Sequence, residues 1–261
     1  ENKSPQPEIK VSGFPSVIPF NGGKINHIFA CDKGLYEDSF ASLAARRCFE
    51  NPASVVSLKV HGECCLMMRQ EIIAGKFEWT FFTRFDTKGK ALPTNSVSLP
   101  AGVQPASYEN HLYCFIPLEK SKMVGKGSKK SYLGRDTYGA IDEGVSRGDI
   151  PDANSANCPD FITVEWVGRK HQGNVDDLSV DHGMYIHGSV TLDIPERSYE
   201  SMKKMAQTVS IEGLIFYDVE TGERFKVRFD MFEDSLFARN SKLPIGTETT
   251  TIKPKVIAAN L

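Results

Sequence analysis

Charged and apolar residues alternate strictly in one stretch near the end of the chain. The cationic members are Arg224, Lys226 and Arg228, and the apolar members are Phe225, Val227 and Phe229. Because successive side chains of a strand point to opposite faces, this pattern predicts a strand with one cationic and one apolar face. The apolar stretch 209–219 precedes it across Glu220-Thr-Gly222. The two stretches therefore predict an antiparallel hairpin.

The length of the hairpin loop decides which residues share a face. A three-residue loop at 220–222, with Gly222 left-handed, pairs Lys226 with Phe216 and puts Glu212 on the face of Lys226 and Arg228. A two-residue turn puts Glu212 on the opposite face, because a slip of one residue exchanges the faces. The catalytic interpretation below requires the longer loop.

The remaining patterns predict a mixed fold with few helices. Helices are expected over 38–49, capped by Asp38 or Ser39, and over 195–207. Exposed loops are expected over the Lys-rich stretch 119–135 and over 136–160. Strands are expected over 55–58, 64–68, 77–85, 113–118 and 161–167. Strands that do not alternate regularly with helices favour an α+β fold with antiparallel sheet.

Composition narrows the function classes. The chain has 261 residues and is 40% apolar, which suits one large globular domain or two small ones. Its 31 basic and 33 acidic residues give a net charge of -2, so a generally polycationic nucleic-acid binder is excluded, although a local basic groove is not. We expect no membrane span, because no apolar run approaches 18 residues. Residues 1–15 lack the apolar core of a secretory signal.

The six cysteines form no C-x-x-C pair. They indicate free thiols in a reducing intracellular compartment, the cytoplasm or the nucleus. A metal site made of His61, Cys64 and Cys65 is disfavoured, because adjacent strand residues point to opposite faces.

Four short segments combine reactive and conformationally special residues. They are Lys59-Val-His-Gly62, Val164-Glu-Trp-Val-Gly168, Ile211-Glu-Gly-Leu-Ile215 and Phe225-Lys-Val-Arg228. Each alone is common in unrelated chains. Together, in this order and at these separations, they resemble the covalent nucleotidyltransferase superfamily of DNA ligases, RNA ligases and capping enzymes.

Flanking residues are similar to the RNA ligase branch of this superfamily. The stretch Glu165 to Asn174 looks like its Glu-x-x-Gly…Gly-Asn segment, and His182-Gly-Met-Tyr-Ile-His-Gly188 looks like the segment that follows. Lys59-Val-His-Gly-Glu-Cys-Cys65 is most similar to the RNA 5′-phosphate and 3′-hydroxyl ligases of animals and giant viruses. The resemblance covers residues 55–232.

The resemblance implies an antiparallel-sheet nucleotidyltransferase fold of the ATP-grasp-like ligase adenylation type. It implies an ATP-dependent RNA ligase in which Lys59 takes AMP, passes it to an RNA 5′-phosphate, and the RNA 3′-hydroxyl then expels AMP. Mg²⁺ or Mn²⁺ would neutralise phosphate charge. The implied site residues are Lys59 as nucleophile, Glu165 on the ribose hydroxyls, Glu212 on the metal, Lys226 and Arg228 on phosphate oxygens, Arg84 on the nucleotide or acceptor end, and Trp166 or Phe216 stacked on adenine. Lys59, Glu165, Glu212, Lys226 and Arg228 are expected to face one another in a cleft.

Two residues depart from the superfamily pattern. His61 stands where Asp is usual, which puts the role of that carboxylate in doubt. Arg228 stands where a second Lys is usual; it keeps the charge but changes the geometry. A nucleophilic lysine has to lose its proton, and neighbouring cations such as Lys226 and Arg228 favour that loss.

The expected organisation is a flexible segment over 1–20, the nucleotidyltransferase domain over 21–240 and a tail over 241–261. About thirty residues follow Arg228, too few for the OB-fold that usually follows in DNA ligases and capping guanylyltransferases, so no C-terminal OB-fold is expected. These enzymes remain one alternative. A non-catalytic RNA-end binding module on the same fold, with His61 as a sign of decay, is the other.

Overall fold

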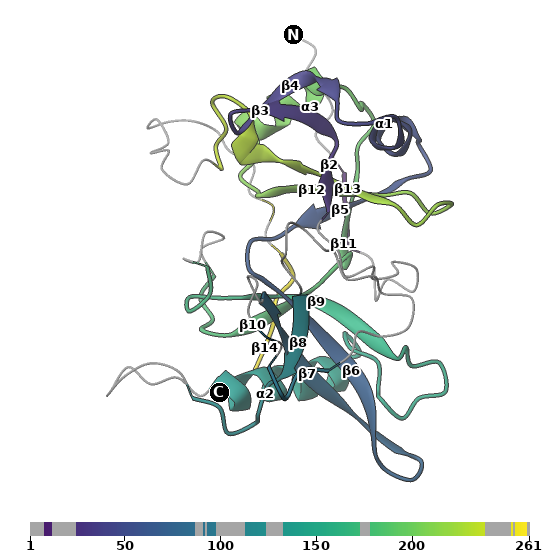
Figure 1. Cartoon of the computed structure of the whole chain (residues 1–261), viewed down its shortest axis with the longest axis vertical. Helices are drawn as coiled ribbons and strands as arrows, with labels where there is room; N and C mark the ends of the chain where they lie inside the picture. The colour runs from purple at the N-terminus through teal and green to yellow at the C-terminus, as the bar shows by residue number, and fades with distance from the viewer. Residues whose placement is uncertain are drawn as a thin grey trace. The chain divides into compact units, whose positions relative to one another are not determined.

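A computed structural model describes residues 8–11, 25–86, 91, 93–97, 113–123, 133–172, 178–237, 252 and 254–259. The described chain forms two compact units (Figure 1). Unit 1 takes the described parts of Glu1–Pro19, Ile25–Val60 and His187–Pro254, and unit 2 takes those of His61–Ile186 and Lys255–Leu261. The chain passes from unit 1 to unit 2 directly after Val60.

Unit 1 contains a six-stranded sheet in the order β1-β11-β5-β12-β13-β2. The strands are β1 (Glu8–Val11), β2 (Asn26–His27), β5 (Val55–Lys59), β11 (Val190–Asp193), β12 (Gly213–Tyr217) and β13 (Arg224–Arg228). Neighbouring strands are antiparallel, except that β2 lies parallel to β13. A separate hairpin joins β3 (Phe29–Asp32) to β4 (Leu35–Phe40). The helical elements are α1 (Leu43–Glu50), α3 (Tyr199–Thr208) and the short η2 (Phe229–Met231).

Aromatic rings make the core of unit 1. Phe29 is 2% exposed and lies edge-on to Tyr36, Phe49 and Tyr199, with ring centroids 5.2–5.6 Å apart. The helices α1 and α3 both begin at capped positions. Ser42 accepts the backbone N–H of Ala45, and Ser198 forms a reciprocal capping box with Ser201.

Unit 2 contains a second six-stranded sheet, in the order β14-β10-β9-β6-β7-β8. Its strands are β6 (Glu63–Ile73), β7 (Lys76–Asp86), β8 (Tyr113–Pro117), β9 (Phe161–Val167), β10 (Gly183–Ile186) and β14 (Ile257–Ala258). The helix α2 (Leu133–Ser146) packs against β14, β10 and β7. Buried Leu66, Phe82 and Phe115 form part of the core.

The mixed architecture with antiparallel sheets and few helices confirms the predicted fold class at this level. The strand at 161–167 has the predicted bounds, and the others agree within a few residues except β6, which runs on to Ile73. The exposed loop predicted over 136–160 is wrong for residues 136–146, because these belong to α2, which buries Thr137, Ala140 and Ile141. Residues 147–160 form turns and irregular structure. Asp38 and Ser39 lie in β4, so they do not cap α1.

Further sequence expectations concern the cysteines, the Lys-rich stretch and membrane spans. All six cysteines are free, and Cys64 and Cys65 are consecutive residues of β6. Most of the Lys-rich stretch, residues 124–132, lies outside the described residues. None of the helices in the described part of the chain is long and apolar enough to cross a bilayer.

Candidate active site

Three neighbouring strands of unit 1 bring Lys59 and Arg228 to one face of the sheet. Lys59, the last residue of β5, lies opposite Gly213 of β12, and Gly213 lies opposite Arg228 of β13. Directly opposed residues share a face, so Lys59 and Arg228 flank a position that has no side chain. The next row on this face contains Ser57, Ile215 and Lys226. We call the face that carries Lys59, Lys226 and Arg228 the cationic face.

Gly213 is required by a close backbone contact. A Cβ atom at this position would lie 2.0 Å from the carbonyl oxygen of Val227. No side chain is compatible with that distance, so the residue that follows Glu212 has to be glycine.

Glu212 holds the side chain of Lys59. Its carboxylate Oε1 lies 2.6 Å from the Nζ atom of Lys59, and the two side chains are 5% and 21% exposed. The carbonyl oxygen of Glu212 accepts a hydrogen bond of 2.8 Å from the N–H of Phe229, which fixes the backbone. The ion pair therefore orients the lysine at the edge of the cationic face.

Asp230 holds Arg228. The Nε atom of Arg228 donates to Oδ1 of Asp230 at 3.0 Å, and an Nη2 hydrogen bond to Oδ2 makes the contact bidentate. Burial disfavours the charged guanidinium, but the hydrogen bonds and charge of Asp230, with a contribution from the charge of Glu212, outweigh it and raise the pKa of Arg228. Arg228 thus stays cationic, in a fixed orientation and within the electrostatic reach of Glu212.

The predicted hairpin register is wrong by one residue. The N–H of Asp218 donates to the carbonyl of Glu223 at 2.9 Å, so the loop has four residues, 219–222, and Lys226 lies opposite Ile215 rather than Phe216. Gly222 is left-handed as predicted, with φ of 73°.

Glu212 still reaches the cationic face despite this register. Regular alternation would place its side chain on the other face, because its neighbour Gly213 lies opposite Arg228. However, β12 begins only at Gly213, whose φ of 155° departs from that of a regular strand. The alternation does not extend back to Glu212, and its carboxylate reaches Lys59.

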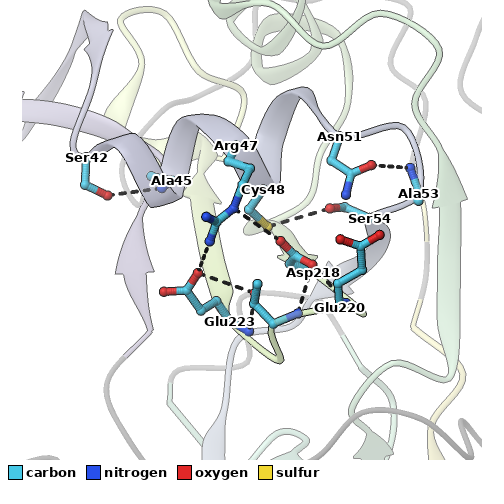
Figure 2. Close-up of polar contacts among 11 residues, drawn as sticks. Ser42, Ala45, Arg47, Cys48, Asn51, Ala53, Ser54, Asp218, Glu220 and Glu223 are labelled. Atoms are coloured by element: carbon cyan, nitrogen blue, oxygen red, sulfur yellow. Dashed lines mark hydrogen bonds and ion pairs between the residues drawn. The ribbon is translucent and has the colours of Figure 1, made fainter.

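The loop and helix α1 together hold this register (Figure 2). Oδ1 of buried Asp218 accepts the N–H groups of Glu220 and Thr221 at 2.9 and 3.2 Å. From α1, Arg47 reaches Glu223 at 2.8 Å and Asp218 at 3.8 Å. The hydrogen bonds outweigh the desolvation of Asp218 and lower the pKa of its carboxyl.

Glu165 and Arg84 lie in unit 2. Glu165 of β9 lies opposite Cys64 of β6, and alternation along β7 puts Arg84 on the same face as Cys64. Glu165 is half-buried, whereas Arg84 is exposed. Gly62 packs against this strand, because a Cβ on it would lie 2.3 Å from the carbonyl oxygen of Trp166.

Neither predicted adenine-stacking ring lies on the cationic face of unit 1 or on the face of unit 2 that carries Glu165 and Arg84. Trp166 follows Glu165 on the opposite face of β9, is 3% exposed and packs against Phe81 and His171. Phe216 lies opposite Phe225 and packs against Phe49 at a centroid distance of 5.0 Å. Both rings are core residues of their own units.

Sequence reasoning missed three residues beside the cationic ones: Tyr36, whose hydroxyl accepts the N–H of Arg228, Asp230, which binds the guanidinium of Arg228, and His27, which lies opposite Lys226 in the strand register. Asp230 carried a weak signal, since it is a carboxylate two residues after Arg228.

No group of three or more His, Cys, Asp or Glu residues that could hold a metal lies in the described ranges. A divalent ion at Glu212 would therefore need water and phosphate oxygens as its other ligands.

The structure is similar to those of two RNA ligase variants from Naegleria gruberi. The first, without ligand, is 12% identical and has a TM-score of 0.35; the second, with AMP and Mn, is 11% identical and has a TM-score of 0.36. The matches cover 84% and 85% of this chain but only 64% of each ligase. No protein-family model and no curated protein matches the sequence. At these TM-scores the likeness is distant, and the functional argument rests on the residues of the chain itself.

Proposed function

We propose that this protein is an ATP-dependent RNA ligase that joins an RNA 5′-phosphate to an RNA 3′-hydroxyl. The observation that carries the proposal is the Lys59–Glu212 pair at 2.6 Å, on a sheet face that also carries Lys226 and Arg228. A lysine beside a carboxylate and two further cations supplies a nucleophile, a ligand for a metal and positive charge for phosphate oxygens. The order of the four sequence segments supports the same assignment.

In the first step the unprotonated Nζ of Lys59 attacks the α-phosphorus of ATP. The bond from that phosphorus to the bridging oxygen breaks and pyrophosphate leaves. Lys226 and Arg228 stabilise the negative charge on the phosphate oxygens. Arg228 suits this role because Asp230 fixes its orientation through Nε and Nη2, and the other N–H groups of the guanidinium can bind phosphate.

The next two steps are also displacements at phosphorus. An oxygen of the RNA 5′-phosphate attacks the AMP phosphorus, the bond to Nζ breaks, and Lys59 regains a proton. The 3′-hydroxyl of the other RNA end then attacks the adenylylated 5′-phosphate and AMP leaves. The cationic face serves every step, whereas Lys59 is the nucleophile only in the first.

Glu212 fits a divalent ion, because its carboxylate is nearly buried beside the nucleophile. Mg²⁺ or Mn²⁺ bound there would neutralise phosphate charge. An ammonium in an ion pair has no lone pair for attack, so Glu212 has to release Lys59 before the first step. We assign Glu165 to the ribose hydroxyls and Arg84 to the nucleotide or the acceptor end as predictions from the resemblance.

Incubation with ATP labelled at the α-phosphate, followed by a denaturing gel, tests the proposal. We expect a covalent label from ATP and little from GTP, and joining of 5′-phosphorylated RNA. A label from GTP instead would indicate a capping guanylyltransferase. Joining of nicked DNA in preference to RNA would indicate a DNA ligase, and RNA binding without any label would indicate a non-catalytic RNA-end binding module.

A further inference from the structure

The edge strand β2 adds a histidine to the cationic face. It runs parallel to β13, with His27 directly opposite Lys226 and a 2.9 Å hydrogen bond from the N–H of Ile28 to the carbonyl of Lys226. Opposed residues of paired strands share a face. His27, which is half-buried, therefore extends the row Ser57, Ile215, Lys226 by one strand.

Tyr36 connects His27 to Arg228, the next cationic residue of β13 after Lys226. Its hydroxyl oxygen lies 2.6 Å from Nδ1 of His27 and accepts the N–H of Arg228 at 2.9 Å. Tyr36 is 6% exposed, and burial raises the pKa of its phenol, so the hydroxyl keeps its proton at neutral pH. That hydroxyl is therefore a donor and an acceptor at once.

These two contacts select one tautomer of a neutral His27. Nδ1 of His27 is the acceptor that lies within hydrogen-bonding distance of this buried hydroxyl, so the hydroxyl donates its proton there and Nδ1 accepts. The imidazole proton then resides on Nε2. A neutral imidazole in this form is a hydrogen-bond donor that adds no positive charge beside Lys226.

We propose that His27 is a further phosphate-binding residue of the cationic face, donating from Nε2, and that Tyr36 is the positioning residue that fixes its tautomer. The phosphate belongs to the nucleotide or to the RNA 5′ end, and this identification rests on the proposed ligase function. The hydrogen bond itself needs only a phosphate held at the cationic face, where His27 pairs with Lys226.

Tripolyphosphate binding, followed by calorimetry, tests the inference without requiring catalysis. We expect His27→Ala to weaken binding about tenfold, in keeping with the loss of a hydrogen bond to a charged group. His27→Gln should recover most of the affinity, because its amide N–H can replace Nε2–H. Asn26→Ala, the neighbour on the other face of β2, is the matched control and should bind as wild type. Each variant should unfold at the wild-type temperature.

Imidazole ¹⁵N NMR reads the tautomer directly. The wild type should show protonated Nε2 and unprotonated Nδ1 for His27, whereas Tyr36→Phe should show a mixture of tautomers and weaker tripolyphosphate binding. Protonated Nδ1 in the neutral wild type, or wild-type affinity in His27→Ala, overturns the inference. Failure of the wild type to bind tripolyphosphate overturns it as well.

Two activity measurements identify the source of the phosphate. Slower labelling of His27→Ala by ATP indicates the triphosphate, and slower transfer of AMP to 5′-phosphorylated RNA with normal labelling indicates the RNA end. If the wild type labels and joins but His27→Ala matches it in both, the inference fails while the ligase proposal stands. If the wild type takes no label, the ligase proposal fails and tripolyphosphate binding still decides the inference.

Discussion

Lys59 is held by a carboxylate that is itself almost excluded from water. Removal of one partner of such a pair leaves a poorly solvated charge behind. In the proposed reaction Glu212 has two successive partners, the lysine before the nucleotide reacts and a divalent ion during each phosphoryl displacement. The residue at 212 is therefore expected to matter beyond the step that uses Lys59.

Replacement of Glu212 tests this double role. Glu212→Ala should lower RNA joining by about 100-fold or more, because phosphate charge loses its metal-held neutralisation. The loss should occur both with ATP plus 5′-phosphorylated RNA and with RNA supplied already adenylylated. Glu220→Gln, an exposed glutamate of the same unit, is the control. Near-wild-type joining by Glu212→Ala, or full activity of the wild type in excess chelator, would show that Glu212 holds no essential metal.

At the scale of the element, the hairpin β12–β13 carries most of the cationic face. Its strand positions and its alternating faces were predictable, because period-two patterns report local geometry. Its register was not predictable. The side chain of Asp218 accepts hydrogen bonds from two loop N–H groups, and the loop is one residue longer than predicted. Helix α2 was not predicted for a related reason. Its Gly and Asp residues favour turns locally, whereas its packing against β14, β10 and β7 depends on tertiary structure that the local sequence does not report.

Gly213 tests the steric account of the hairpin. Gly213→Ala should lower the free energy of unfolding by more than about 3 kcal/mol, because its Cβ meets the backbone of Val227 at 2.0 Å. Gly222→Ala is the matched control. Gly222 is left-handed, but its Cβ would contact nothing within 4 Å, so a cost of about 1 kcal/mol is expected. Urea unfolding of both variants measures the difference. Equal costs would contradict the close-contact explanation.

Asp218 gives the hairpin a pH-dependent stability. The folded protein lowers the pKa of its carboxyl below the reference value of 3.8, so the ionised form stabilises the fold above about pH 4. That contribution is lost as the pH falls through the lowered pKa. Asp218→Asn should therefore be less stable than wild type by about 1–2 kcal/mol near pH 7, and the difference should shrink below pH 4. Unfolding curves from pH 7 to pH 3 measure it. A difference that stays constant over this range would contradict the assignment.

At the scale of the whole molecule, the predicted site residues are divided between the two units. Lys59, Glu212, Lys226 and Arg228 lie in unit 1, and Glu165 and Arg84 lie in unit 2. The sequence identified the polar residues of each sheet face, because their spacing is local. It could not assign strands to sheets: β5 and β6 are separated by three residues yet belong to different sheets. The domain boundaries at 21–240 stay a prediction, as does the facing of Glu165 toward Lys59, Glu212, Lys226 and Arg228.

We predict that Glu165 of unit 2 contributes to the choice of nucleotide. If its carboxylate binds the ribose hydroxyls, Glu165→Ala should raise the KM for ATP and reduce discrimination against 2′-deoxy-ATP by about tenfold. Glu63→Ala, an exposed glutamate of β6, should keep the wild-type preference. Labelling rates with the two nucleotides give the ratio. An unchanged ratio in Glu165→Ala would remove Glu165 from the nucleotide site.

The most direct measurement of the central assignment compares wild type and Lys59→Ala in two reactions. The first is covalent labelling by ATP, and the second is joining of RNA supplied already adenylylated. We predict that Lys59→Ala takes no label but still joins adenylylated RNA, because no enzyme–AMP bond takes part in that last step. A folded Lys59→Ala protein that still forms a covalent adenylate would contradict the account, and the nucleophile would then have to be sought at another lysine, Lys226 first.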